Sequence, residues 1–83
     1  MSTMTWRAEL TDTFGGEANY AWVRRETFTL AHDATDRQIV AAGKAALGLS
    51  GTRCRTTNYG DLFECRPVGT CTVAFIQPDI PED

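Results

Sequence analysis

Apolar and polar residues alternate along the first part of the chain. In residues 5–12 the even positions from Trp6 to Leu10 are apolar, and the odd positions carry charged or hydroxyl groups. This period of two is typical of a β-strand with one buried face. Residues 19–30 are rich in aromatic and β-branched types, which favour a second strand. Because the glycines within residues 14–19 suit a turn, the pattern predicts an antiparallel hairpin.

The spacing of apolar residues lengthens after residue 35. One helical stripe would hold Ile39, Val40, Gly43, Ala46 and Leu47. Thr35 and Gln38 have the spacing of a capping box, in which each side chain bonds the backbone of the other residue. Gly48 is placed to end the helix in a left-handed conformation. The pattern therefore predicts a helix over residues 36–47 whose small residues allow close approach to a sheet.

Three further strands are predicted in the second half of the chain, over residues 52–57, 62–66 and 71–77. The first two flank the turn sequence NYGD and should form a hairpin. One register places all of its charges on one face and its apolar residues on the other. The pairs in that register are Cys54–Cys65, Arg55–Glu64 and Thr56–Phe63. The last strand is apolar on both faces, which favours the centre of the sheet.

The predicted order is β-β-α-β-β-β within a single domain of residues 1–83. The simplest fold with this order is a two-layer α+β domain, in which a single antiparallel sheet has one helix packed on one face. The other face of the sheet is then left for solvent or a partner. Residues 78–83, PDIPED, form an acidic tail with two prolines that should leave the sheet.

Composition limits the classes of function. The chain has 83 residues, a net charge of −3 and a pI near 5.0. Dedicated nucleic-acid binders usually carry a basic excess, so nucleic acid is disfavoured as a partner without being excluded. No apolar run approaches the roughly 20 residues that span a membrane. The first ten residues lack the pattern of a signal peptide, so we expect a cytoplasmic protein with no membrane partner.

The reactive side chains do not form a recognisable catalytic or metal-binding pattern. The odd count of cysteines, Cys54, Cys65 and Cys71, does not suit a disulfide framework, and their spacing does not match a zinc hook. His32 is the sole histidine, and spacing alone leaves a Cys–His pair with Cys54 open. The paired glycines precede a strand and lack the lysine of a phosphate-binding loop. We expect no enzyme activity, no cofactor and no bound metal.

The second predicted strand has two possible arrangements. If it is regular, Tyr20 and Trp22 share a face with Phe28, and Trp22 is buried. A bulge near Arg24 and Arg25 would instead leave Tyr20 and Trp22 pointing outward beside the arginines. We favour the buried Trp22.

Acidic residues gather at the predicted turns, and aromatic and basic residues gather on the second strand. Carboxylates that line one edge would suit a groove rich in lysine and arginine on another protein. The predicted partner-binding residues are Asp12, Glu17, Tyr20, Trp22, Arg24, Arg25 and Asp61.

Two segments carry a resemblance to known proteins. DTFGGEANYAWVRR, residues 12–25, and GDLFECRPVGTCTVAFI, residues 60–76, resemble small uncharacterised proteins of phages and prophages. Small acidic proteins of that origin include anti-CRISPR proteins, which bind a CRISPR–Cas effector and block its access to target DNA. The resemblance implies a non-enzymatic inhibitor in the host cytoplasm, with a host protein such as an effector subunit as its partner.

Two other functions are left open by the sequence. Aromatic residues interleaved with arginine are typical of modules that bind single-stranded nucleic acid. In that case a basic stripe over the uncovered sheet face would be extended by Arg7, Arg53, Arg55 and Arg66. A homodimeric phage accessory protein would instead bury that face against a second copy. The sequence does not decide between a monomer and a homodimer.

Overall fold

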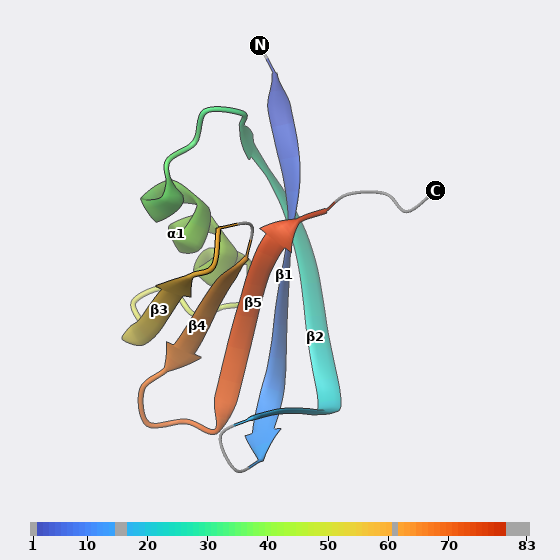
Figure 1. Ribbon diagram of the computed structural model, residues 1–83, viewed down its shortest axis with the longest axis vertical. Coiled ribbons are helices and arrows are strands. Elements are labelled where there is room, and N and C mark those ends of the chain that lie inside the picture. The colour runs from blue at the N-terminus through green and yellow to red at the C-terminus, as the bar shows by residue number, and fades with distance from the viewer. Residues whose placement is uncertain (1, 15–16, 61, 80–83) are drawn as a thin grey trace.

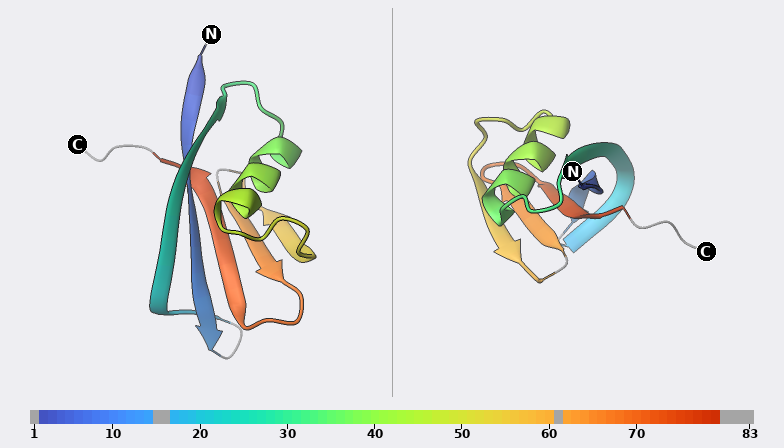
Figure 2. Two further views of the ribbon diagram at one scale, coloured as in Figure 1. Left: turned by 180° about the vertical axis from the view of Figure 1, so that it is seen from behind. Right: turned by 90° about the horizontal axis from the view of Figure 1, so that it is seen from above.

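In the computed structural model, which describes residues 2–14, 17–60 and 62–79, the chain folds as an antiparallel sheet with one helix. The elements within these residues are β1 (Thr3–Phe14), β2 (Glu17–Ala31), α1 (Asp36–Ala46), β3 (Cys54–Asn58), β4 (Phe63–Pro67) and β5 (Thr72–Pro78). The strand order is β2-β1-β5-β4-β3, so β5 is central, as its two apolar faces predict. The helix α1 lies against one face of the sheet (Figure 1, Figure 2). The predicted α+β class is confirmed.

The hydrophobic core lies between α1 and the sheet. Trp6 and Ala8 of β1 are buried on this side, together with Ala74 and Ile76 of β5. Gly43 of α1 faces Ile76 directly. A Cβ atom at this glycine would overlap the Ile76 Cδ1 atom and lie 2.8 Å from its Cγ1 atom. The glycine therefore permits the close approach of α1 to β5.

Both ends of α1 follow from signals in the sequence. The Thr35 hydroxyl accepts a hydrogen bond from the Gln38 backbone N–H at 3.2 Å, and Gln38 Oε1 accepts one from the Thr35 N–H at 2.8 Å. After the C-cap residue Leu47, Gly48 has a left-handed φ of +74°. The predicted capping box and terminal glycine are confirmed, and α1 ends at Ala46, one residue before the predicted boundary.

The β3–β4 hairpin has a different register from the predicted one. The observed pairs are Cys54–Pro67, Arg55–Arg66, Thr56–Cys65, Thr57–Glu64 and Asn58–Phe63. The predicted pairing of Cys54 with Cys65 is therefore wrong by two residues. A slip of two residues keeps every side chain on its face, so alternation alone does not separate the two registers. The turn separates the two registers, because the Tyr59 N–H donates to the Leu62 carbonyl at 2.8 Å and Gly60 supplies a φ of +100°.

The β1–β2 hairpin is regular along most of its length and irregular near its turn. Pairing is continuous from Thr3–Ala31 to Thr11–Val23 and resumes at Thr13–Ala18. Residues 19–22, here called the irregular segment, therefore lie opposite Asp12 alone, and Tyr20 has a φ of +57°. The bulge considered near Arg24 and Arg25 is misplaced, because those two residues pair regularly with β1.

The first residues of the predicted tail belong to the sheet. Pro78 is the last residue of β5 and pairs with Trp6, and the Asp79 N–H donates to the Thr5 carbonyl at 3.0 Å. The prediction that residues 78–83 leave the sheet is wrong for these two, because β1 continues beside them and offers a further acceptor. The rest of that tail lies outside the described residues.

Candidate partner-binding surface

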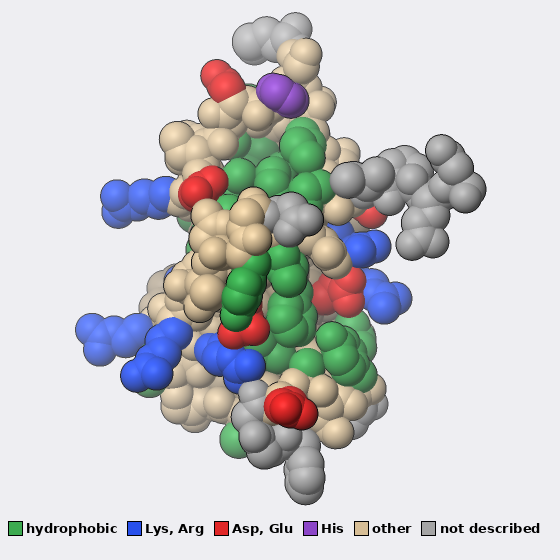
Figure 3. Space-filling model, in the orientation of Figure 1, with side chains coloured by type: hydrophobic (Ala, Val, Ile, Leu, Met, Phe, Trp, Pro, Cys, Tyr) green, Lys and Arg blue, Asp and Glu red, His purple; other side chains and the backbone are tan. Residues whose placement is uncertain are grey.

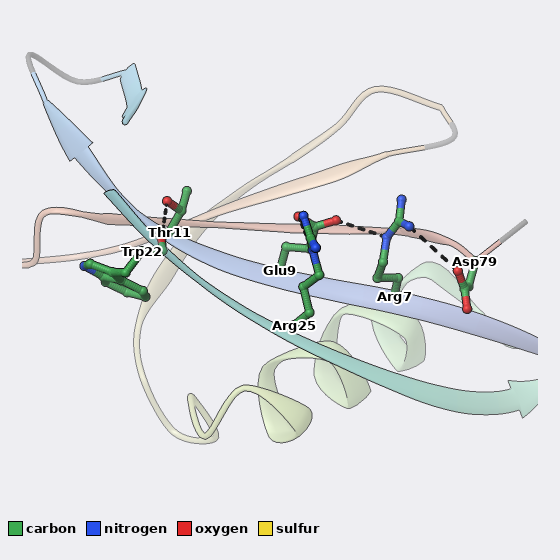
Figure 4. Close-up of polar contacts among 6 residues, drawn as sticks. All are labelled: Arg7, Glu9, Thr11, Trp22, Arg25 and Asp79. Atoms are coloured by element: carbon green, nitrogen blue, oxygen red, sulfur yellow. Dashed lines mark hydrogen bonds and ion pairs between the residues drawn. The ribbon is translucent and has the colours of Figure 1, made fainter. Parts of the chain in front are cut away.

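The sheet face turned away from α1, here called the open face, carries a cluster of paired charges. Glu9 Oε1 lies 3.0 Å from Arg7 Nε, and Glu9 Oε2 lies 3.3 Å from Arg25 Nε (Figure 4). Asp79 Oδ1 lies 3.8 Å from Arg7 Nη1. The Glu9 side chain is only 15% exposed, so one enclosed carboxylate serves two guanidinium groups. Glu9 was not among the predicted site residues, although alternation in β1 places it on this face.

Next to this cluster the open face is hollowed. A shallow depression of about 310 Å³ is lined by Glu9, Tyr20, Leu62, Phe75 and Gln77. Tyr20 is 57% exposed, so its ring borders the depression and still faces solvent. Figure 3 shows a strip of hydrophobic side chains on this side of the molecule, flanked by charges of both signs. The open face is therefore amphipathic.

Trp22 is exposed, and the prediction of a buried Trp22 is wrong. It is 46% exposed, and Figure 4 shows its ring pointing away from the cluster of Arg25 and Glu9. The reason is that the irregular segment leaves the regular ladder at this residue. The fully buried Thr11 holds the segment, since its hydroxyl donates to the Trp22 carbonyl at 2.8 Å.

Arg24 and Arg25 are neighbours in sequence but project from opposite faces of β2. Arg24 Nη1 donates to the Leu47 carbonyl at 3.3 Å, and Arg24 Nε lies 3.5 Å from Glu26 Oε1. Leu47 caps the carboxyl end of α1, where unpaired carbonyls and the helix dipole favour a cation. Arg24 therefore ties β2 to α1, whereas Arg25 belongs to the open face. The structure separates two residues that were predicted to act together.

The three acidic residues of the predicted site have different outcomes. Asp12 accepts a hydrogen bond from Asn19 Nδ2 at 2.9 Å, so it helps to hold the irregular segment. Glu17 is exposed at the start of β2. Asp61 lies outside the described residues, and its role stays a prediction.

The predicted site residues that come together lie at one end of the β1–β2 hairpin. We call this region the aromatic end; it consists of Asp12, Glu17, Tyr20, Trp22 and Val23. Val23 is an exposed apolar residue that was not predicted, because the pattern of a regular strand gives no sign of where the ladder breaks. The aromatic end combines exposed rings, two carboxylates and a backbone held by hydrogen bonds.

The predicted basic stripe is interrupted by acidic residues. Arg66 Nε lies 2.9 Å from Glu64 Oε1, in the same way that two other arginines of the open face pair with Glu9. Arg55 lies directly opposite Arg66 in the β3–β4 hairpin, so positive charge is locally concentrated there. Elsewhere on this side, acidic side chains alternate with basic ones (Figure 3).

A larger hollow of about 470 Å³ lies between α1 and the β3–β4 hairpin, with Phe63 in its lining. Polar groups at its rim are bonded within the protein. Lys44 Nζ donates to the Thr52 carbonyl at 2.7 Å, and Asn58 Nδ2 donates to Asp36 Oδ2 at 3.0 Å. These bonds use groups that a small ligand would otherwise contact, so the hollow is a weaker candidate than the aromatic end.

The most enclosed thiol belongs to Cys65. Burial raises the pKa of this thiol above its ordinary value of 9.0, although a hydrogen bond with the Thr56 hydroxyl, 3.7 Å away, acts in the opposite direction. A buried thiol that keeps its proton is a poor nucleophile. Among residues 2–14, 17–60 and 62–79, no three His, Cys, Asp or Glu side chains are grouped to hold a metal ion. The same part of the chain contains no helix long and apolar enough to cross a membrane.

No protein-family model matches this chain, and no curated protein or solved structure matches it either. A functional proposal therefore rests on the surface itself. On that surface the aromatic end is the region where exposed apolar rings, charge and ordered backbone occur together.

Proposed function

We propose that this protein is a non-enzymatic inhibitor that binds a partner protein through its aromatic end. The observation that supports this proposal is the exposure of Tyr20 and Trp22 on a segment held by hydrogen bonds with β1. Tyrosine and tryptophan are enriched among the residues that dominate binding energy at protein interfaces. Rings on an ordered backbone also lose less conformational freedom when a partner binds.

The charges of the same region favour a basic partner. Asp12 and Glu17 belong to the same end of the β1–β2 hairpin as Tyr20 and Trp22, and the whole chain carries a net charge of −3. Such carboxylates speed association with a groove rich in lysine and arginine. CRISPR–Cas effectors hold nucleic acid in positively charged channels. Together with the phage origin expected from the sequence, this supports anti-CRISPR activity in the host cytoplasm, in which the aromatic end occupies the DNA-binding groove of an effector subunit.

This proposal is tested in a host that carries an active CRISPR–Cas system. The tagged protein should retain an effector subunit from the host, and a phage that the system targets should plate more efficiently when the protein is expressed. The purified effector should lose its affinity for target DNA when the protein is added. If no effector subunit is retained and plating is unchanged, the anti-CRISPR proposal is wrong.

A second candidate function is binding of single-stranded nucleic acid. Arg55 and Arg66 lie directly opposite each other on the open face. Like charges in that position repel, and a phosphate backbone would relieve the repulsion. Affinity for single-stranded DNA or RNA that falls steeply with added salt would support this function. Absence of binding at low salt would exclude it.

A further inference from the structure

The outer edge of β2 presents unpaired backbone groups at regular intervals. In an antiparallel pair, residues that bond to the neighbouring strand alternate with residues whose backbone groups point away from it. The bond from the His32 N–H to the Ser2 carbonyl, 3.0 Å long, shows that even-numbered residues of β2 bond to β1. On the other side of β1, the Thr5 carbonyl accepts from the Asp79 N–H and the Thr13 N–H donates to the Cys71 carbonyl. Odd-numbered residues of β1 therefore bond toward β5, which leaves its even-numbered residues to bond to β2. The outward residues of β2 are therefore Val23, Arg25, Thr27, Thr29 and Ala31.

This edge is longer than the opposite edge of the sheet. The regular stretch of β2, Val23–Ala31, has nine residues, whereas the strand at the other edge, β3, has five. All of the outward residues are exposed. Phe28 and Leu30 pack against the core from this edge but are only half-buried. A long edge with free N–H and C=O groups is a template for another strand.

We propose that β2 pairs with β2 of a second copy of this chain. The two strands run antiparallel across a twofold axis at Thr27 and join two five-stranded sheets into one. The regular stretch Val23–Ala31 is centred on Thr27, so this register uses its whole length. The pairing satisfies the outward backbone groups of both copies and covers the outer flanks of Phe28 and Leu30.

Charge disfavours the registers in which the axis lies at Arg25 or at Glu26. With the axis at Thr27, Arg25 lies opposite Thr29 of the second copy, and Glu26 lies opposite Phe28 of the second copy. Moving the axis to Glu26 or to Arg25 would place that residue opposite its own copy, and like charges directly opposite each other are unfavourable. With the axis at Thr27, neither Arg25 nor Glu26 lies opposite a like charge of the second copy.

The register is tested by disulfide cross-linking in a Cys54→Ser/Cys71→Ser background. At Thr27→Cys the two Cα atoms of the dimer lie about 5.5 Å apart, as in a hydrogen-bonded antiparallel pair, and within the range that a disulfide spans. Mild oxidation should convert most of this variant to a covalent dimer. The matched control is Thr29→Cys, on the same face of the same strand, whose two copies are about 14 Å apart in this register. Equal cross-linking of both variants, or none at position 27, would overturn the proposal.

A second test uses proline, which removes one backbone N–H. Thr27→Pro deletes an outward donor and leaves the bonds between β1 and β2 intact, so it should weaken the dimer about tenfold or more in sedimentation velocity. Thr56→Pro is the control, because Thr56 is an outward residue of the opposite edge, and this variant should dimerise like the wild type. Thermal unfolding by circular dichroism shows that each variant folds. A wild type that stays monomeric to about 300 μM, well above the micromolar range of ordinary specific contacts, or a dimer weakened only by Thr56→Pro, would contradict pairing at β2.

The dimer and the proposed function share only Val23 of the aromatic end. The irregular segment with Tyr20 and Trp22 lies outside the paired stretch Val23–Ala31. Failure of the cross-link at Thr27 would leave partner capture through Trp22 unaffected, and failure of capture would leave the cross-link unaffected.

Discussion

The two faces of the sheet are built from alternate residues of the same strands, yet they are organised by different interactions. On the face under α1, Trp6, Ala8 and Ile76 are buried in a continuous apolar core. On the open face, the enclosed carboxylate of Glu9 pairs with two arginines, and Phe75 is only half-buried. The difference indicates that apolar packing under α1 supplies most of the folding free energy. The open face and the aromatic end keep charged and aromatic side chains exposed to solvent.

The largest difference in the free energy of unfolding is expected between substitutions of two neighbouring residues of β5, one on each face of the sheet. Ile76→Ala removes a fully buried side chain and should lower the free energy of unfolding by about 2–5 kcal/mol. Phe75→Ala is the matched change on the open face and should cost less than half as much. Urea unfolding of the two variants measures both values. Equal losses would show that the two faces contribute alike.

A smaller effect is expected where α1 meets β5. Gly43→Ala adds a methyl group that overlaps Ile76, so it should cost about 1–3 kcal/mol in spite of the better helix propensity of alanine. Shortening the facing side chain with Ile76→Val should recover part of this loss, which a double-mutant cycle measures in urea. If Gly43→Ala instead stabilises the protein, the helix is not held against Ile76 as described.

The charged cluster of the open face should contribute less than the core. Glu9→Gln leaves Arg7 and Arg25 without their shared carboxylate and should lower stability by about 0.5–1.5 kcal/mol at low salt, since the arginines are partly screened by solvent. The loss should shrink as salt is added. Glu64→Gln, which affects the single partner Arg66, should cost less. A loss of equal size in high salt would show that Glu9 acts through packing.

The smallest effect concerns pH and the buried thiol of Cys65. Burial raises the pKa of this thiol above 9.0, so the folded protein keeps a proton that the unfolded chain releases. The resulting stability is fully present below pH 9.0 and is lost as pH rises through the folded-state pKa. The free energy of unfolding should therefore fall more steeply above pH 9.0 in the wild type than in Cys65→Ala. Parallel curves would show that burial does not affect this titration.

The sequence was sufficient for features that depend on local pattern. The capping box of Thr35 and Gln38 and the left-handed Gly48 follow from residue types at fixed spacing. The β3–β4 register was mispredicted because a slip of two residues preserves both faces, and the turn bond from Tyr59 to Leu62 is invisible in the alternation.

The candidate site was harder to predict because it depends on contacts between strands. The exposure of Trp22 follows from a break in the β1–β2 ladder that the Thr11 hydroxyl holds from the opposite strand. The separation of Arg24 from Arg25 follows from strict alternation, but the bond from Arg24 to Leu47 depends on where α1 ends. Residue type pointed to the aromatic and basic residues of β2, and tertiary hydrogen bonds decided which of these side chains face solvent.

The most direct test of the binding role of the aromatic end is phage plating on a CRISPR-bearing host that expresses Tyr20→Gly/Trp22→Ala. Glycine adopts the φ of +57° at position 20 without strain, so the change removes the ring and preserves the backbone. Both rings are exposed, so stability should stay within about 0.5 kcal/mol of the wild type. Val68→Ala, an exposed apolar residue outside the aromatic end, is the control. At equal protein levels, we predict that the wild type and Val68→Ala protect the phage and that the double variant does not. Protection by the double variant equal to that of the wild type would contradict a binding role for the aromatic end.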